Sequence, residues 1–330
     1  MKISLDDDLL QASLETALQK YNVKLTESKK LAEYVIQLSD FYIQNPTQET
    51  PWANTWAQIA YLVYFHPFNH ARGLFTVERG NQVKFFDGFT HAIDYGAGLG
   101  SASGALQKLT EIRNFLLIEK NQKAAKMLNN DWTWTTQYED QFLKAPDKTL
   151  AVFSYSYTEL NKLPNWAYDC EGIMILEPAT AKDGRRLLEL RKQLITAGFS
   201  IWAPCLHQQE CPLLKHSKTD WCHDRAHIEA PKWSKAIENY LPFKNQTITT
   251  SYLLARKKKP TELKNMVRLT GDHQKEKGKS KQMICRSDAR EFLSWLERAG
   301  DAPVYPRGDL LEMPEVKVVG AELRVQKKIN

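Results

Sequence analysis

The chain contains 330 residues, of which 42% are hydrophobic and 25% are charged, and its formal net charge is +6. Its 13 Phe, 13 Tyr and 9 Trp residues can fill a sizeable core, which excludes an intrinsically disordered chain, and the length indicates one main domain with additions. No stretch of about 18 apolar residues is present, so a membrane-spanning helix is not expected.

The amino-terminal residues, MKISLDDDLL, place one lysine before three aspartates. A secretory signal needs a basic start and an apolar block, and an organellar presequence needs arginine and few acids. We therefore expect a cytoplasmic, bacterial-type protein with no membrane partner. In such a reducing compartment, the odd number of cysteines, five, points away from a disulfide framework and toward metal binding.

The sequence predicts helices from residue 6 to about residue 80. The segment DDLLQASLETALQKY spaces its leucines along one face of a helix. Thr26 is expected to cap a second helix, and the aromatic-rich segment that follows is expected to form two more, separated near Pro67. Residues 1–85 are thus predicted to be a helical extension in front of the main domain.

Short apolar segments alternate with helical segments between residues 86 and 260. This alternation is typical of a parallel, doubly wound sheet. The expected strands contain, in chain order, HAIDY, NFLLIE, TLAVFSYSY, GIMILE, SIWAPC and TITTSYLLA. We therefore predict a Rossmann-like α/β domain over 86–260, with a cysteine-rich insertion at 203–230.

Residues 261–330 are expected to form a small, basic, β-rich appended unit, with one short helix over 288–300. Eleven Lys or Arg against three acids lie between Arg256 and Arg286, so the rest of the chain is slightly acidic. A concentrated basic segment is either a solubilising face or a surface that contacts nucleic-acid phosphates.

A glycine-rich turn, DYGAGLG, follows the first expected strand of the main domain. Its glycines allow a tight turn and a close approach to a ligand at the N-terminus of the next helix. An acid ends the following strand, where it can accept both ribose hydroxyls of an adenosine ligand. The pattern resembles the S-adenosylmethionine site of class I methyltransferases; the alternative is a turn that holds no ligand. The candidate cofactor-binding residues are Asp94, Gly96, Gly98, Gly100 and Glu119.

The sequence identifies no catalytic residue. Base-amino methyltransferases carry an N/D-P-P-Y/F type motif after the fourth strand, where this chain has FSYSYTEL. Glu177, at the end of the fifth strand, either faces the pocket or caps a loop. Methyl transfer from a sulfonium depends mainly on alignment with a deprotonated acceptor, so a missing general base does not argue against it.

Three of the five cysteines, Cys205, Cys211 and Cys222, lie within one 18-residue window that also holds histidines. The absence of a C-x2-C pair makes an ordinary zinc finger a poor match. The fourth ligand is His223, His227 or a remote cysteine. Cys170 enters a core strand and is expected to be a small buried hydrophobe, whereas Cys285 would join the appended unit to the main domain.

Together, DYGAGLGSAS, EPAT, APCLHQQECPL and DWCH resemble the methyltransferase-like assembly factors of the mitochondrial small ribosomal subunit and their bacterial relatives, over roughly residues 55–290. The resemblance implies S-adenosylmethionine at the glycine turn and small-subunit ribosomal RNA or a pre-ribosomal particle as partner. It also implies a 4Fe-4S cluster. Thiolates with irregular spacing along the chain suit such a cluster better than they suit a zinc ion. The implied cluster ligands are Cys205, Cys211, Cys222 and Cys285. Two positions depart from the family pattern, Ala179 in EPAT and Leu206 after the first cysteine.

We therefore expect an S-adenosylmethionine-dependent RNA methyltransferase acting on the small ribosomal subunit. One alternative is a non-catalytic assembly factor that binds ribosomal RNA and keeps the cofactor and cluster as structural elements. The other is a zinc-stabilised methyltransferase of small molecules with no RNA partner. The sequence specifies neither the methyl acceptor nor the oligomeric state.

Overall fold

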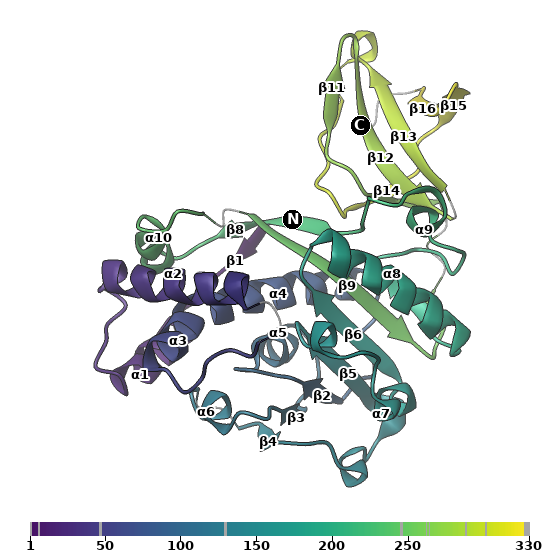
Figure 1. Ribbon diagram of the computed structural model, residues 1–330. Helices are drawn as coiled ribbons and strands as arrows, with labels where there is room; N and C mark the ends of the chain where they lie inside the picture. Colours follow the sequence, from purple (N-terminus) through teal and green to yellow (C-terminus); the bar gives the residue numbers. More distant parts are fainter. Residues whose placement is uncertain are drawn as a thin grey trace.

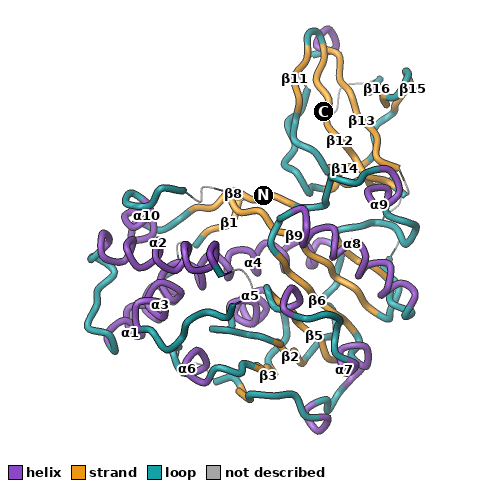
Figure 2. Tube along the Cα trace, in the orientation of Figure 1, coloured by secondary structure: helices purple, strands orange, loops and turns teal. Residues whose placement is uncertain are grey.

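The chain forms a large α/β body and a smaller, all-β lobe that projects from it (Figure 1). Figure 2, in the same orientation, shows that strands and loops make up nearly all of the lobe. The computed structural model describes residues 2–5, 7–45, 48–128, 131–244, 247–261, 263, 265–287, 289–300 and 302–326.

The large body is built on a mixed sheet with the strand order β1-β8-β9-β6-β5-β2-β3-β4, and β7 also pairs with β9. The strands β4, β3, β2, β5 and β6 are mutually parallel, whereas β9 runs antiparallel to β6, β7 and β8. The parallel strands confirm the predicted α/β class, although β9, which was expected to be part of the parallel sheet, runs antiparallel. The strand bounds are β1 Lys2–Ser4, β2 His91–Tyr95, β3 Asn114–Ile118, β4 Thr133–Thr135, β5 Thr149–Ser154, β6 Gly172–Glu177, β7 Ser200–Ala203, β8 Asp224–Glu229 and β9 Thr247–Arg256.

Helices before the sheet confirm the predicted helical start of the chain, with three differences. Glu27, and not Thr26, is the residue before the second helix, and a π-helical turn at Tyr61–Phe65 joins the third and fourth helices without a break at Pro67. The first three residues of the described chain also add β1 to the sheet edge. These helices are α1 (Asp8–Gln19), α2 (Ser28–Gln44), α3 (Thr55–Ala60) and α4 (His66–Gln82).

The helices that follow connect the strands of the sheet or lie beside the cysteine window. They are α5 (Ser101–Leu109), α6 (Gln122–Ala125), α7 (Asn165–Asp169), α8 (Ala181–Thr196), α9 (Pro212–His216) and α10 (Lys232–Glu238), with short 3-10 turns at Asp140–Phe142, Pro146–Lys148, Tyr157–Glu159 and Glu297–Ala299. No helix in the described part of the chain is long and apolar enough to cross a membrane.

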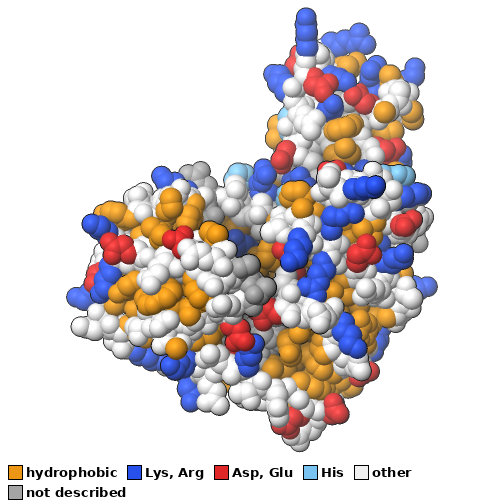
Figure 3. Space-filling view, in the orientation of Figure 1, with side chains coloured by type: hydrophobic (Ala, Val, Ile, Leu, Met, Phe, Trp, Pro, Cys, Tyr) orange, Lys and Arg blue, Asp and Glu red, His pale blue; other side chains and the backbone are white. Residues whose placement is uncertain are grey.

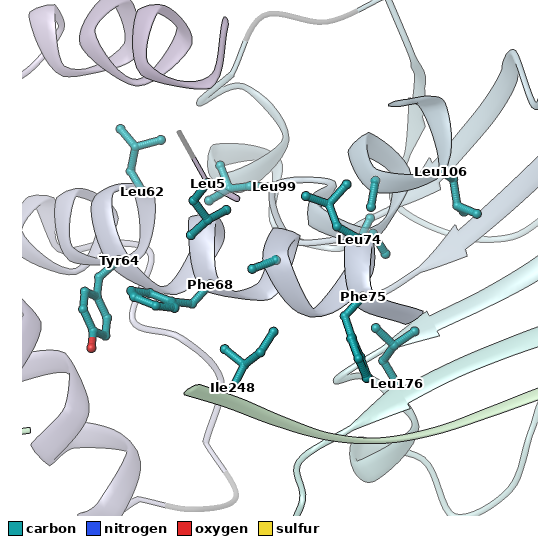
Figure 4. Close-up of a cluster of buried hydrophobic side chains, with 14 of the residues drawn as sticks. Leu5, Leu62, Tyr64, Phe68, Leu74, Phe75, Leu99, Leu106, Leu176 and Ile248 are labelled. Carbon is teal, nitrogen blue, oxygen red and sulfur yellow. The ribbon is translucent and has the colours of Figure 1, made fainter. Parts of the chain in front are cut away.

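The main core lies between the sheet and the helices that precede it. Phe75 of α4 points toward Leu176 of β6, while the Phe68 ring packs on Tyr64 with centroids 4.7 Å apart, and Ile248 of β9 belongs to the same cluster (Figure 4). Gly73 of α4 is needed there, because a Cβ atom would lie 2.9 Å from Ala105 of α5. This close packing fixes α4 against the helix that begins at the glycine turn.

The lobe is a seven-stranded sheet with the order β14-β10-β12-β13-β16-β15, and β11 pairs with β12. The expected helix over 288–300 was wrong, because most of this segment forms β13, which pairs antiparallel with β12 and parallel with β16. Leu293, Ser294 and Trp295 of β13 are all buried, because this strand has a partner strand on each side. The bounds are β10 Met266–Leu269, β11 Gln274–Glu276, β12 Lys279–Arg286, β13 Ala289–Leu296, β14 Leu310–Glu312, β15 Val316–Val319 and β16 Glu322–Val325.

Candidate cofactor site and cysteine site

The glycine turn joins the end of β2 to the start of α5, as the sequence predicted. Gly96, Gly98 and Gly100 have φ angles of 68°, 56° and 77°, which lie in the left-handed region that favours glycine. A Cβ atom on Gly96 would also lie 2.6 Å from the Cβ of Ser156, which follows β5. The turn therefore sits at the carboxyl ends of adjacent parallel strands, where α/β sheets bind ligands.

Two buried carboxyl groups face this turn from the sheet. Asp94 of β2 is 1% exposed, and its Oδ2 accepts a 2.7 Å hydrogen bond from the Ser103 hydroxyl while Oδ1 has no partner. Burial raises the pKa of Asp94 to about 6. Glu119, just after β3, accepts from the Gly98 amide at 3.0 Å and from the Asn121 amide at 2.8 Å. The predicted candidate residues thus converge at one place.

The amino-terminal helices cover the turn. Tyr61 lies in the π-helical turn, and its hydroxyl oxygen is 3.3 Å from where a Cβ of Gly98 would stand. The Tyr61 ring packs on Trp52 with centroids 4.8 Å apart, and burial raises the pKa of its phenol. Sequence reasoning missed Tyr61 because the apolar spacing around it is that of an ordinary core helix.

The ends of β5 and β6 carry a second group of polar residues beside the turn. Tyr155, in the position where a catalytic motif was sought, has a φ of 60°, which is unusual for a residue with a side chain. The Arg72 guanidinium of α4 lies over its ring, 5.9 Å from the centroid. Glu177 accepts from the Thr158 amide at 3.2 Å, and its other oxygen has no partner, so this carboxyl group both caps the loop and keeps a free acceptor.

Glu177 is expected to make stability depend on pH. Burial raises its pKa from 4.5 to about 8, so between these values the unfolded chain releases a proton that the folded protein keeps, and stability falls as pH rises. Relative to Glu177→Gln, the wild type should therefore lose a few kcal/mol of unfolding free energy between pH 5 and 8. Urea unfolding at both pH values measures this. The matched variant Glu189→Gln, at an exposed position, should show nearly the same pH dependence of stability as the wild type. If Glu189→Gln changed that dependence as much as Glu177→Gln does, the raised pKa of Glu177 could not be its cause.

Four cysteines line one cavity between the large body and the lobe. Cys205 follows β7, Cys211 precedes α9, Cys222 precedes β8 and Cys285 lies on β12 of the lobe. Burial, together with the neighbouring cysteines, raises the pKa of Cys211 to about 11 and that of Cys285 to about 12. The structure thus brings the four predicted ligand residues around one space.

His207 also lines this cavity, whereas Cys170 and His223 lie apart from it. Cys170 is fully buried and hydrogen-bonds weakly to the Trp166 carbonyl at 3.6 Å, outside the cavity, as expected of a small core residue. His223 accepts at its backbone carbonyl from Arg307 and is not part of the cavity lining. Within the described ranges, no group of three or more His, Cys, Asp or Glu residues could hold a metal ion as the side chains stand.

Only part of the basic segment is free to contact a partner. Arg256 is buried and pairs with Glu171 at 3.1 Å, and Arg268 is buried beside the cysteine cavity. Lys279 bonds to Glu322 at 2.6 Å. Lys275 and Lys277 are exposed on the β11–β12 hairpin, and basic side chains gather at the tip of the lobe (Figure 3).

Comparison with protein families gives one match. Residues 90–294 match the model of the family described as mitochondrial small ribosomal subunit Rsm22, which covers more than half of the chain. None of the curated proteins matches the chain. The matched range runs from the strand before the glycine turn to β13 of the lobe. It therefore contains the five candidate cofactor-binding residues and the four candidate cluster ligands.

Solved structures similar to this one include three methyltransferases at low scores. A precorrin-6y C5,15-methyltransferase from Geobacter metallireducens GS-15 has a TM-score of 0.33 at 13% identity, covering 54% of this chain and 86% of that one. A SAM-dependent methyltransferase from Archaeoglobus fulgidus scores 0.31 at 14% identity, covering 56% and 94%. An rRNA methylase from Streptococcus thermophilus scores 0.31 at 13% identity, covering 55% and 93%.

Proposed function

Because the chain belongs to the mitochondrial small ribosomal subunit Rsm22 family, we propose that it binds S-adenosylmethionine at the glycine turn and acts on the small ribosomal subunit. The partner in this proposal is small-subunit ribosomal RNA or a pre-ribosomal particle that contains it. One observation carries the cofactor assignment: three left-handed glycines and two buried carboxyl groups meet at the carboxyl ends of β2 and β3.

The residues at the turn fit the chemistry of this cofactor. Glu119 can exchange its hydrogen bond with the Gly98 amide for bonds from ribose hydroxyls, since both are donors. Asp94 keeps one buried oxygen without a partner, and such an oxygen gains from a donor supplied by a ligand or a water. When bound, the cofactor would supply an electrophilic methyl group. The chain's own residues would hold and orient it and exclude water.

We also propose that Cys205, Cys211, Cys222 and Cys285 hold a 4Fe-4S cluster. Zinc at about 2.3 Å from each sulfur requires thiolates only about 3.8 Å apart, and the four thiols line their cavity without forming such a group. A cluster separates its ligands by an inorganic core of iron and sulfide, so wider spacing suits it better. The zinc alternative requires the four side chains to close further.

Cys285→Ser is expected to remove the cluster and loosen the lobe, because this ligand comes from β12 while the others come from the large body. Iron and sulfide content of anaerobically purified protein should fall from about four each per chain to near zero. Limited proteolysis should then cleave the lobe faster. Cys170→Ser, at a buried cysteine outside the cavity, serves as the control and should keep its iron; equal loss from both variants would exclude the ligand assignment.

The lobe is proposed to contact ribosomal RNA through its β11–β12 hairpin. Changing Lys275 and Lys277 to glutamine should weaken binding of small-subunit RNA and lower the slope of log affinity against log salt by roughly 1–2, because each lysine that neutralises a phosphate adds about one to that slope. Filter binding at several salt concentrations measures the slope. Lys29→Gln, an exposed lysine of α2, should leave it unchanged, whereas equal slopes for all three proteins would exclude the hairpin as the contact.

Whether the bound cofactor is used for catalysis is tested by methyl transfer. A methyltransferase should pass label from S-adenosylmethionine to small-subunit RNA, and Gly98→Arg should abolish the transfer. RNA binding without transfer would instead indicate an assembly factor that keeps the cofactor as a structural element. Binding of neither RNA nor cofactor would contradict the proposed function in both forms.

A further inference from the structure

The cysteine cavity is also lined by four arginines, which come from four separate segments of the chain. No aspartate or glutamate is among the described residues that line it. Arg191 belongs to α8 of the large body, and Arg268 and Arg290 belong to β10 and β13 of the lobe, with Arg307 in the loop before β14. A cavity lined by thiols and guanidinium groups, without a carboxylate, is strongly basic.

Hydrogen bonding leaves several of these guanidinium donors unused. The buried Nε atoms of Arg191, Arg268 and Arg290 have no hydrogen-bond partner. Arg191 donates through Nη2 to the His207 carbonyl at 2.7 Å, and Arg268 donates through Nη1 to the Cys222 sulfur at 3.2 Å. Buried donors without acceptors are costly and rare in native proteins, so they indicate an acceptor-rich occupant.

The charges lead to the same conclusion. Arg268 is paired with Asp224, but Arg191 and Arg307 form no ion pair with a carboxylate in the described part of the chain. Arg191 is only 2% exposed, and burial lowers the pKa of Arg307. A buried cation needs an anion nearby, and a four-thiolate cluster is one: it carries a net charge of −2 when oxidised and −3 when reduced.

We propose that Arg191, Arg268 and Arg307 form a cationic group that stabilises the cluster and raises its reduction potential, with Arg268 acting directly through its hydrogen bond to the Cys222 sulfur. This inference rests on the cluster proposed above. Nearby positive charge and donors to sulfur favour the more negative, reduced state. Reduction adds one electron to the iron core, makes or breaks no bond, and needs a one-electron reductant, for which dithionite serves here.

The test compares midpoint potentials in dithionite titrations followed by visible and electron paramagnetic resonance spectra. Arg191→Gln removes a cavity cation that pairs with no carboxylate in the described part of the chain. Arg268→Lys keeps a positive charge beside Asp224, but an ammonium group cannot bond to both the Asp224 carboxylate and the Cys222 sulfur as the planar guanidinium does. Arg225→Gln, an exposed arginine of β8 whose ion pair with Asp272 lies outside the cavity, is the charge-matched control.

Both cavity variants should have a lower midpoint potential than the wild type, and the control should not. Loss of iron from a folded Arg191→Gln protein, with Arg225→Gln fully loaded, would also support the cationic group. Full iron content with unshifted potentials in both cavity variants would overturn this inference and leave the cluster in place. A wild-type protein without iron and sulfide would refute the cluster itself.

Discussion

Asp224→Ala is expected to lower the free energy of unfolding by about 3–5 kcal/mol, the usual cost of removing one partner from a buried ion pair. Asp224 is fully buried and forms an ion pair with Arg268 of the lobe. Its other oxygen accepts from the Tyr252 hydroxyl at 3.1 Å and lies 3.8 Å from the Arg79 Nε. Removal therefore leaves the buried Arg268 without its ion-pair partner and the Tyr252 hydroxyl without its acceptor, and it takes a nearby carboxylate from Arg79.

The same carboxylate explains how the lobe is held on the body. Arg79 of α4 also pairs with Asp309 at 2.6 Å, and Asp309 precedes β14 of the lobe. Gly308, whose φ is 90°, packs directly against the Asp224 carboxylate. The variant should consequently expose the lobe to protease as well as lower the urea midpoint.

An exposed ion pair provides the control for Asp224. Asp272 pairs with Arg225 at 3.3 Å, with the two side chains about half exposed, and such pairs contribute roughly 0–1 kcal/mol. Asp272→Ala should thus change the unfolding free energy little. If Asp224→Ala were as mild, the buried network could not be what joins the lobe to the body.

Gly98→Arg is expected to abolish cofactor binding. The new side chain would start 3.3 Å from the Tyr61 hydroxyl and would project from the turn at which the proposal places the cofactor. Isothermal titration with S-adenosylhomocysteine measures the loss. The backbone would also be strained, because Gly98 has a φ of 56°, and a left-handed side-chain residue costs about 1–2 kcal/mol.

Gly88→Arg separates that strain from the effect on the site. Gly88 also has a left-handed φ, 85°, but a Cβ there meets no atom within 4 Å. This variant should bind the cofactor as the wild type does, although it is similarly strained. Weakened binding in both variants would mean that loss of stability, and not the turn, explains the result.

The sequence predicted four of the parallel strands, β2, β3, β5 and β6, because each is a continuous apolar segment between turn residues, but it missed the short strand β4, whose sequence is TWT. It failed where pairing between distant segments decides the structure. The segment 288–300 has a helix-like composition, yet β12 and β16 provide it with strand partners on both sides. The strand β1 gains its structure from β8, more than 200 residues away, which no local pattern can indicate.

In the candidate sites, too, local patterns could be predicted from the sequence, whereas contacts between distant segments could not. Asp94 and Glu119 could be predicted because strand ends and a glycine turn fix their relative places along the chain. The arginines of the cysteine cavity could not, since Arg268 lies within a basic segment that the sequence predicts to be exposed, either as a solubilising face or as a surface for nucleic acid. Its burial depends on Asp224, 44 residues earlier in the chain, and this pairing becomes visible only in the folded structure.

Direct titration of S-adenosylhomocysteine into the purified chain, with Gly98→Arg as the blank, tests the central claim most directly. We expect saturable binding at one site per wild-type chain and no binding to the variant. Absence of binding by folded wild-type protein, or equal binding by both proteins, would contradict the assignment of the glycine turn as the cofactor site.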